Sequence, residues 1–191
     1  MLFNQIYMLT RRVEREKKLS GISIDIRKEI INDFRNYFEF ELTNDQLTSL
    51  EQVLNDLSKK VPMRRMLQGE VGSGKTLVAL ISLFAVINSG LQGAMMAPTE
   101  ILAEQHYLNV IKNFKGKPFL DYDKTISKIL LPGLLNKQIV VGLLIGSQTL
   151  NHKKLVYKLI ENREIDLIIG THTLFQENFK PYNLSYFKTS C

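Results

Sequence analysis

One stretch carries most of the information in this sequence: Gly69-Glu70-Val71-Gly72-Ser73-Gly74-Lys75-Thr76. It fits the phosphate-binding loop pattern, which is Gly, four residues, Gly, Lys and then Ser or Thr. Glycines let the backbone wrap so that successive N–H groups point inward, and the helix that follows adds its positive end. We therefore expect the backbone of residues 69–74 to cradle the phosphates of a nucleotide. Lys75 would reach the outer phosphates, and Thr76 would hold Mg²⁺.

The flanks of this loop supply the strand and the helix that the pattern requires. Met66, Leu67 and Gln68 predict a short strand that ends at Gly69. Residues 76–89 are almost continuously apolar, which is typical of a helix buried on nearly every face. A flexible glycine turn is the alternative interpretation, and this context favours phosphate binding over it.

The composition limits the class of protein. The chain has 191 residues, 45% of them hydrophobic, which is enough for one domain with an appendage and argues against global disorder. The net charge of +6 suits an anionic partner such as nucleic acid but does not establish one. The one cysteine, Cys191, excludes a disulfide within the chain, and we find neither a signal peptide nor a membrane-spanning apolar run. We therefore expect a cytoplasmic protein with no membrane partner.

Beyond the loop, strands alternate with helices along the chain. Apolar runs predict strands over 92–97, 139–145 and 166–169, and helical spacing predicts helices over 99–113 and 150–162. This alternation predicts an α/β fold with a parallel sheet that helices cover on both faces. Residues 114–138 are interpreted as an insertion that contains a short helix. Ahead of the loop, helices are expected at about 1–20, at about 25–38 and from Thr43 onward.

Four blocks of sequence occur in a characteristic order: Phe40-Glu41-Leu42-Thr43-Asn44-Asp45-Gln46, residues 68–76, Met96-Ala97-Pro98-Thr99-Glu100-Ile101-Leu102-Ala103-Glu104-Gln105-His106, and Gly170-Thr171-His172-Thr173-Leu174-Phe175-Gln176. Together they resemble the first motor lobe of the RecG family, the ATP-dependent DNA helicases of superfamily 2. The resemblance covers most of residues 1–184 and implies a RecA-like lobe over residues 40–191, preceded by linker helices over residues 1–39. It implies ATP and Mg²⁺ as cofactors, with Lys75 and Thr76 in catalytic roles. It also implies branched DNA as the partner, in recombination and repair, and a monomer, although the sequence itself leaves the oligomeric state open.

The family places an adenine-sensing element at Phe40 and Gln46. An aromatic ring can stack on a purine, and a side-chain amide can exchange two hydrogen bonds with the adenine edge. Thr43 and Gln46 also have the spacing of a helix capping box. From the spacing alone the two interpretations of Gln46 are equally good, and the family resemblance favours adenine.

Two further segments are those that the family uses to grip the DNA backbone. They are Pro98-Thr99-Glu100, which follows a strand and opens a helix, and Gly170-Thr171-His172. N–H groups at a helix start suit a phosphate, and phosphate contacts carry no sequence specificity. The alternative for Thr99 is a purely structural role, as the N-cap residue where a strand is followed by a helix.

The sequence departs from the family pattern near its end. The family continues with a strand that ends in Asp-Glu-x-His, where the acids support Mg²⁺ and the attacking water. Here residues 183–191 hold no such acidic pair, and no second lobe follows in this sequence. We therefore expect a truncated lobe with an unpaired sheet edge, weak Mg-ATP binding and little hydrolysis. The alternatives are a nucleotide-dependent binding module without motor activity, or another phosphate-loop enzyme such as a small-molecule kinase.

Overall fold

The computed structural model describes residues 21–26, 29–37, 41–114, 117–120, 123–130, 138–175, 181 and 184–188. The helix expected over residues 1–20, and Phe40 of the expected adenine element, lie outside these ranges. Within the described ranges, every helix is too short or too polar to reach across a lipid bilayer.

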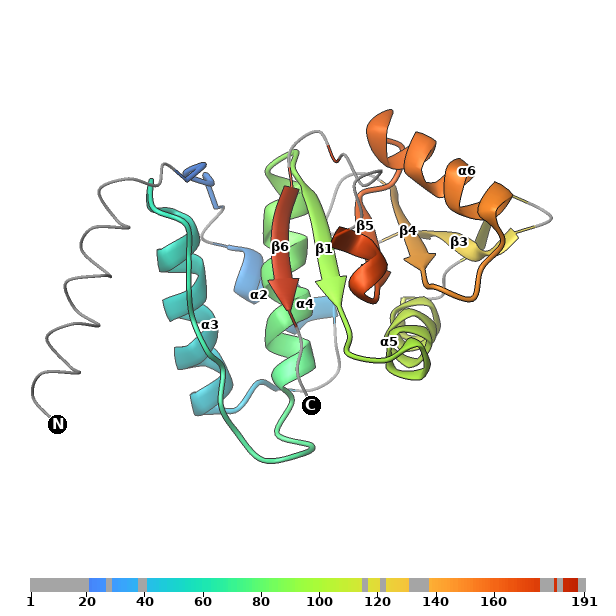
Figure 1. The fold of residues 1–191 in the computed structure, drawn as a ribbon. Helices are drawn as coiled ribbons and strands as arrows, with labels where there is room; N and C mark the ends of the chain where they lie inside the picture. Colours follow the sequence, from blue (N-terminus) through green and yellow to red (C-terminus); the bar gives the residue numbers. More distant parts are fainter. Residues whose placement is uncertain are drawn as a thin grey trace, which may run out of the picture.

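A six-stranded mixed sheet forms the centre of the fold, in the order β2-β3-β4-β5-β1-β6 (Figure 1). The strands are β1 Gln92–Met96, β2 Lys117–Leu120, β3 Asp123–Leu130, β4 Gln138–Leu144, β5 Leu167–Gly170 and β6 Leu184–Lys188. Strands β4, β5, β1 and β6 run parallel to one another, whereas β2 and β3 pair in antiparallel fashion. The α/β class is confirmed, but the prediction of a purely parallel sheet is wrong for the two strands at one edge.

The β2–β3 hairpin stands where a short helix was expected within residues 114–138. The expectation rested on Ile126, Ile129, Leu130 and Leu131. The spacing of three between Ile126 and Ile129 fits one face of a helix. In β3 that same spacing sends the two side chains to opposite faces of the sheet, where each is buried in a different cluster of apolar residues. The Tyr107 hydroxyl lies 2.8 Å from Ser127 Oγ in a buried hydrogen bond that ties the hairpin to the neighbouring helix.

Helices cover both faces of the sheet, as predicted. They are α2 Ile30–Tyr37, α3 Asn44–Leu57, α4 Lys75–Asn88, α5 Glu100–Asn113, α6 Leu150–Glu161 and the short 3-10 helix η1 His172–Phe175. Apolar residues of α2, α3, α4 and α5 share one core with the sheet, and those of α6 form a second core on its other face. Residues 30–34 of the predicted linker thus pack into the same core as the lobe.

Helix α4 is fixed at the middle of the larger core by three aromatic rings. Phe84 is completely buried, and its ring centroid lies 5.9 Å from that of Phe34 and 5.2 Å from that of Phe114. Burying a phenylalanine side chain contributes about 1.5–3 kcal/mol, and edge-to-face contacts add to it. The phosphate loop therefore leads into a helix whose position is well determined.

Two expectations about the end of the sheet are wrong. Residues 66–68 form no strand: Met66 is 85% exposed, and Arg65 beside it is held by side chains of α3. The strand that was expected to be missing is present over residues 184–188 as β6, which pairs with β1 in register from Gln92↔Leu184 to Met96↔Lys188 and forms the edge of the described sheet. Strand pairing uses backbone groups, so it does not require the acidic residues that the family carries there.

Candidate functional site

The phosphate loop has the backbone conformation that its glycines predict. Gly72 and Gly74 have φ angles of 85° and 82°, a left-handed region that disfavours other residues. A side chain at Gly72 would meet nothing within 4 Å, and Val71 is fully exposed, so the loop faces open space. A large anion can therefore approach this backbone closely.

Helix α4 begins at Lys75 with its N-terminus directed into the loop. Its N-cap is Gly74, which supplies no side-chain cap hydrogen bond, so no capping side chain occupies its first N–H groups. Lys75 Nζ donates to the carbonyl oxygens of Gly69, at 2.8 Å, and Glu70, at 2.7 Å. The ammonium group thus lies across the loop, where it can neutralise a polyphosphate.

The residues present fit a nucleotide polyphosphate better than a protein-held metal. No cluster of three or more His, Cys, Asp or Glu residues that could bind a metal ion occurs among the described residues. A Mg²⁺ ion here would depend on the nucleotide's own oxygens and on the hydroxyl of Thr76, which is half-buried in the first turn of α4.

Gln46 makes the capping-box contacts that the sequence predicts, together with a contact to the phosphate loop that it did not. It closes the capping box of α3: Thr43 N donates to Gln46 Oε1 at 3.0 Å, and Gln46 N donates to Thr43 Oγ1 at 3.3 Å. Its Nε2 also donates to the Ser73 carbonyl in the phosphate loop at 2.9 Å. A Cβ at Gly74 would overlap this Nε2, so the close approach requires glycine.

The two interpretations of Gln46 are compatible. A side-chain amide oxygen has two lone pairs, and its nitrogen has two hydrogens. The capping box uses one lone pair, and the Ser73 carbonyl uses one hydrogen. One lone pair of Gln46 Oε1 and one hydrogen of its Nε2 therefore stay available for the edge of an adenine. The contact of Gln46 with adenine stays a prediction.

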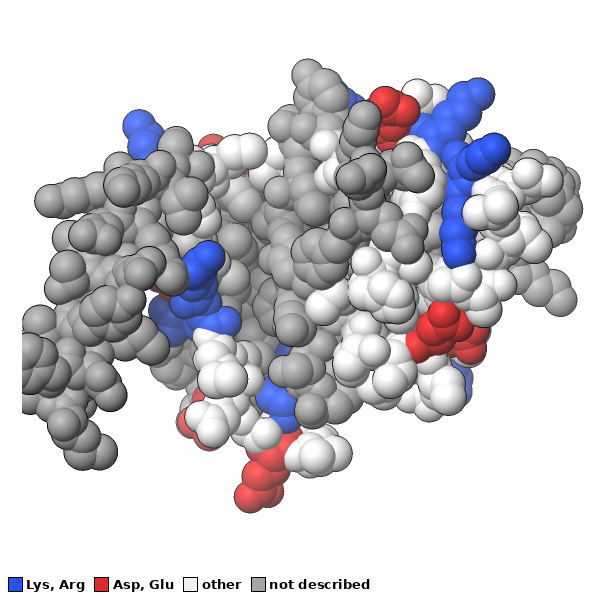
Figure 2. Space-filling view, viewed as in Figure 1, with Lys and Arg blue, Asp and Glu red and all other residues white. Residues whose placement is uncertain are grey.

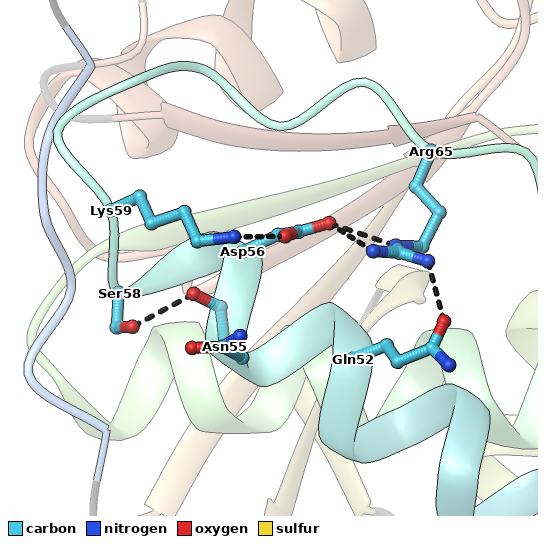
Figure 3. Close-up of polar contacts among 6 residues, drawn as sticks. All are labelled: Gln52, Asn55, Asp56, Ser58, Lys59 and Arg65. Atoms are coloured by element: carbon cyan, nitrogen blue, oxygen red, sulfur yellow. Dashed lines mark hydrogen bonds and ion pairs between the residues drawn. The ribbon is translucent and has the colours of Figure 1, made fainter.

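A set of polar contacts that the sequence analysis missed holds the segment ahead of the loop. Arg65 donates to Asp56 Oδ2 from Nε at 2.8 Å and from Nη2 at 2.6 Å, and to Gln52 Oε1 from Nη1 at 2.6 Å (Figure 3). We call Gln52, Asp56 and Arg65 the α3 tether. Lys59 Nζ donates to Asp56 Oδ1 at 2.8 Å; this hydrogen bond, and then those from Arg65, hold the pKa of the Asp56 carboxyl below its ordinary value. A helical spacing of four between Gln52 and Asp56 was the available signal.

The two segments expected to contact DNA lie close together, at the carboxyl ends of the neighbouring strands β1 and β5. Met96 pairs with Gly170 at the ends of β1 and β5, and Leu144 of β4 pairs with the same glycine from the other side. Thr99 caps α5, because its side chain accepts from Leu102 N at 3.3 Å. The structure therefore brings residues 98–100 and 170–172 close together, whereas their contact with DNA stays a prediction.

The side chains of residues 170–172 differ sharply in accessibility. Thr171 is 1% exposed, and its backbone N–H donates to the Leu144 carbonyl at 3.3 Å. Thr173 Oγ1 donates to the same carbonyl at 2.9 Å, and a Cβ at Gly170 would overlap that oxygen. His172 is exposed. Of these residues, His172 can meet a ligand with its side chain, and Gly170 and Thr171 shape the backbone.

Glu100 is engaged by a loop that the sequence analysis did not consider. Ser147 N donates to Glu100 Oε1 at 3.1 Å, and a Cβ at Gly146 would come within 2.6 Å of that oxygen. The hydrogen bonds from Ser147 hold the pKa of the Glu100 carboxyl below its ordinary value. Lys153 Nζ donates to the Gly146 carbonyl. The loop between β4 and α6 is therefore fastened to the start of α5.

Basic side chains do not single out a site by themselves. On the face seen in Figure 2, Lys and Arg gather over the region of α6, whose sequence carries Lys153, Lys154 and Lys158. Exposed Glu161 and Glu164 follow in the same part of the chain. A charged helix face of this kind is well explained as solvated surface.

Known proteins match the chain over its whole described fold. The DEAD/DEAH box helicase family matches residues 43–189. The ATP-dependent DNA helicase RecG of Aquifex aeolicus is 38% identical over 188 residues, which make up 97% of this chain and 21% of that protein. The protein of the same name from Borreliella burgdorferi is 36% identical over 188 residues, which are 97% of this chain and 24% of that protein. The chain thus spans about a fifth to a quarter of the length of these relatives.

A solved structure gives the same result in three dimensions. It is described as RecG bound to three-way DNA junction, and it matches with a TM-score of 0.74 and 36% sequence identity. The match covers 92% of this chain and 21% of that chain. The predicted resemblance to the RecG motor lobe and the predicted class of fold are both confirmed.

Proposed function

Because this chain belongs to the DEAD/DEAH box helicase family, we propose that it serves as the ATP-binding motor lobe of a RecG-type ATP-dependent DNA helicase. The observation that carries the proposal is the phosphate loop: left-handed glycines, an uncapped helix start and a lysine across the opening. The similarity of the chain to RecG proteins over 97% of its length supports the same conclusion. A protein of this class would be cytoplasmic, and we propose that location and a monomeric parent.

In the proposed function, residues 69–76 bind ATP together with Mg²⁺. The backbone of the loop and the start of α4 would hold the phosphates, with Lys75 neutralising the outer ones. The Thr76 hydroxyl would be the protein's ligand to the ion, and Gln46 would read the adenine with Phe40 beside it. The bound ion would offset charge on the phosphates during their transfer.

Residues 98–100 and 170–172, at the carboxyl ends of β1 and β5, would contact the backbone of DNA. The solved relative whose description names a three-way DNA junction supports branched DNA as the partner of the whole protein. Exposed His172 and the start of α5 at Thr99 are the groups best placed for phosphate contacts. Such contacts suit a protein that acts on DNA of any sequence, in recombination and repair.

Titration of this chain with Mg-ATP by isothermal calorimetry tests the proposal. We expect binding by the wild type and its loss in Lys75→Ala, with Lys154→Ala as a control that removes the same charge on exposed α6. Equal affinity of Lys75→Ala and the wild type would refute the assignment of the loop. DNA stimulation of ATP hydrolysis by the whole parent protein separates a helicase from a kinase, because a kinase would not respond to DNA.

A further inference from the structure

The segment that leads into the phosphate loop lacks the contacts that place a strand. Residues 62–70 have no regular secondary structure, and the described sheet ends at β6 without them. A ladder of backbone hydrogen bonds would fix such a segment within a sheet. Side-chain contacts must take over this task if Gly69 and Glu70 are to have a definite position ahead of α4.

The α3 tether provides a contact with a defined direction. The guanidinium of Arg65 makes three hydrogen bonds from a rigid plane, two to Asp56 Oδ2 and one to Gln52 Oε1. The other carboxylate oxygen of Asp56 accepts from Lys59, so both oxygens are engaged. A planar fork held at three points restricts rotation as well as distance, which a lysine at the same position could not do.

Helix α3 contacts the phosphate-binding region at two separate places. Near its start, Gln46 donates to the carbonyl of Ser73 on the far side of the loop. Near its end, Gln52 and Asp56 hold Arg65, four residues before Gly69. The helix itself is fixed because Leu50 and Val53 are buried in the protein. One rigid element thus grips the chain both before and within the loop.

We propose that the α3 tether is a positioning element for nucleotide binding, in which Arg65 holds the approach to the phosphate loop on α3. This inference rests on the proposed binding of Mg-ATP at residues 69–76. The tether touches no phosphate itself; it raises the fraction of molecules in which Gly69 and Glu70 are correctly placed. An apparent dissociation constant is the intrinsic one divided by that fraction, so losing the tether weakens binding.

The exposure of the tether sets the size of the effect. The side chains of Arg65 and Asp56 are 32% and 21% exposed, so the ion pair adds little to the stability of the whole fold. A contact of this kind changes affinity by about twofold to fivefold. The tether should therefore act on binding more clearly than on the melting temperature.

Calorimetric titration of Arg65→Ala with Mg-ATP and with Mg-tripolyphosphate is the direct test. We expect the dissociation constant for both ligands to rise by about twofold to fivefold, because the tether positions the phosphate-binding backbone. Asp56→Ala should change the dissociation constant in the same direction, because it removes two of the three hydrogen bonds of Arg65, and the double variant should show the same rise as Arg65→Ala. A merely structural defect would instead lower the number of binding sites and leave the dissociation constant unchanged, which would overturn the proposal.

Two neighbouring cations provide matched controls. Arg64→Ala removes an equal charge from the same exposed segment, and Lys59→Ala removes a hydrogen bond from the same carboxylate without touching that segment. Both should bind Mg-ATP as the wild type does. A rise in Arg64→Ala equal to that in Arg65→Ala would show that charge, and not position, governs the affinity, and would overturn the proposal.

A second measurement keeps the test independent of nucleotide binding. The amide of Ser73, which donates to the Glu70 carbonyl at 3.2 Å, should exchange its hydrogen faster in nucleotide-free Arg65→Ala than in the wild type, Arg64→Ala or Lys59→Ala. Unchanged exchange in Arg65→Ala would refute the tether. If the wild type failed to bind Mg-ATP while exchange still responded as expected, the proposed function would fail and the positioning of the segment would stand.

Discussion

Replacing Gln46 and Thr43 separately should divide the roles of the capping box and the adenine contact. Thr43→Ala removes the oxygen that accepts from Gln46 N, and loss of such a cap costs about 1 kcal/mol of stability. Gln46→Glu keeps an oxygen for Thr43 N, because glutamate is the usual partner in a capping box. It removes the N–H groups that serve Ser73 and would serve adenine.

The expected nucleotide affinities follow from the hydrogen bonds at stake. Gln46→Ala would lose two bonds to adenine at about 1 kcal/mol each, which corresponds to about thirtyfold weaker ATP binding. GTP presents a different edge, so its affinity should fall much less. Gln46→Glu should keep the stability that the capping box supplies and still weaken ATP, whereas Thr43→Ala should lose that stability and keep the ratio of ATP to GTP affinity.

Calorimetric titration with each nucleotide, together with urea unfolding, measures both quantities on the same samples. The reasoning would be refuted if Gln46→Ala weakened ATP and GTP equally. It would also fail if Thr43→Ala changed the two affinities as much as Gln46→Ala does, because Gln46 would then act only by closing the end of α3.

Three further outcomes are expected. Glu100→Ala should weaken binding of a three-way DNA junction, measured by fluorescence anisotropy. Glu100→Gln should bind within about twofold of wild type, because it keeps an oxygen that accepts from Ser147 N. Tighter binding by the Gln variant would indicate direct repulsion between the carboxylate and phosphate. Phe84→Ala should lower the free energy of unfolding by about 3–5 kcal/mol, and a loss under about 1 kcal/mol in urea unfolding would contradict the described core. Burial lowers the pKa of His106, whose Nε2 has no hydrogen-bond partner among the described residues. As the pH falls below the unfolded pKa of about 6.5, the unfolded chain therefore binds more protons than the folded one, and the free energy of unfolding decreases. His106→Leu should reduce this decrease between pH 7 and 5. An unchanged slope would show that other groups cause it.

The elements that the sequence predicted correctly are those with a strong local pattern. Helix α4 follows from an apolar run behind the phosphate-loop motif, and helix α5 follows from Thr99 as its cap. The structure confirms both to within one residue at their starts. Local spacing and capping decide such elements, so a single sequence is enough to find them.

The errors lie where pairing between distant segments decides the structure. The spacing of Ile126 and Ile129 fits a helix equally well, and only the presence of β4 beside them makes a strand. Residues 66–68 have the composition of a strand but form none, and Arg65 just before them is hydrogen-bonded to Asp56 on α3. The contact between Glu100 and Ser147 joins residues 47 positions apart, so no local pattern could reveal it.

The carbonyl group of Leu144 links the segment around His172 to the central strands, so a force on that segment would be passed to the sheet through it. It accepts hydrogen bonds from Thr171 N and Thr173 Oγ1, and Gly170 leaves no space between it and β5. A force applied at exposed His172 would therefore reach the central strands directly, with little bending of the surface. Under the proposed function, these ends of the strands would meet DNA as a stiff surface rather than as a yielding loop.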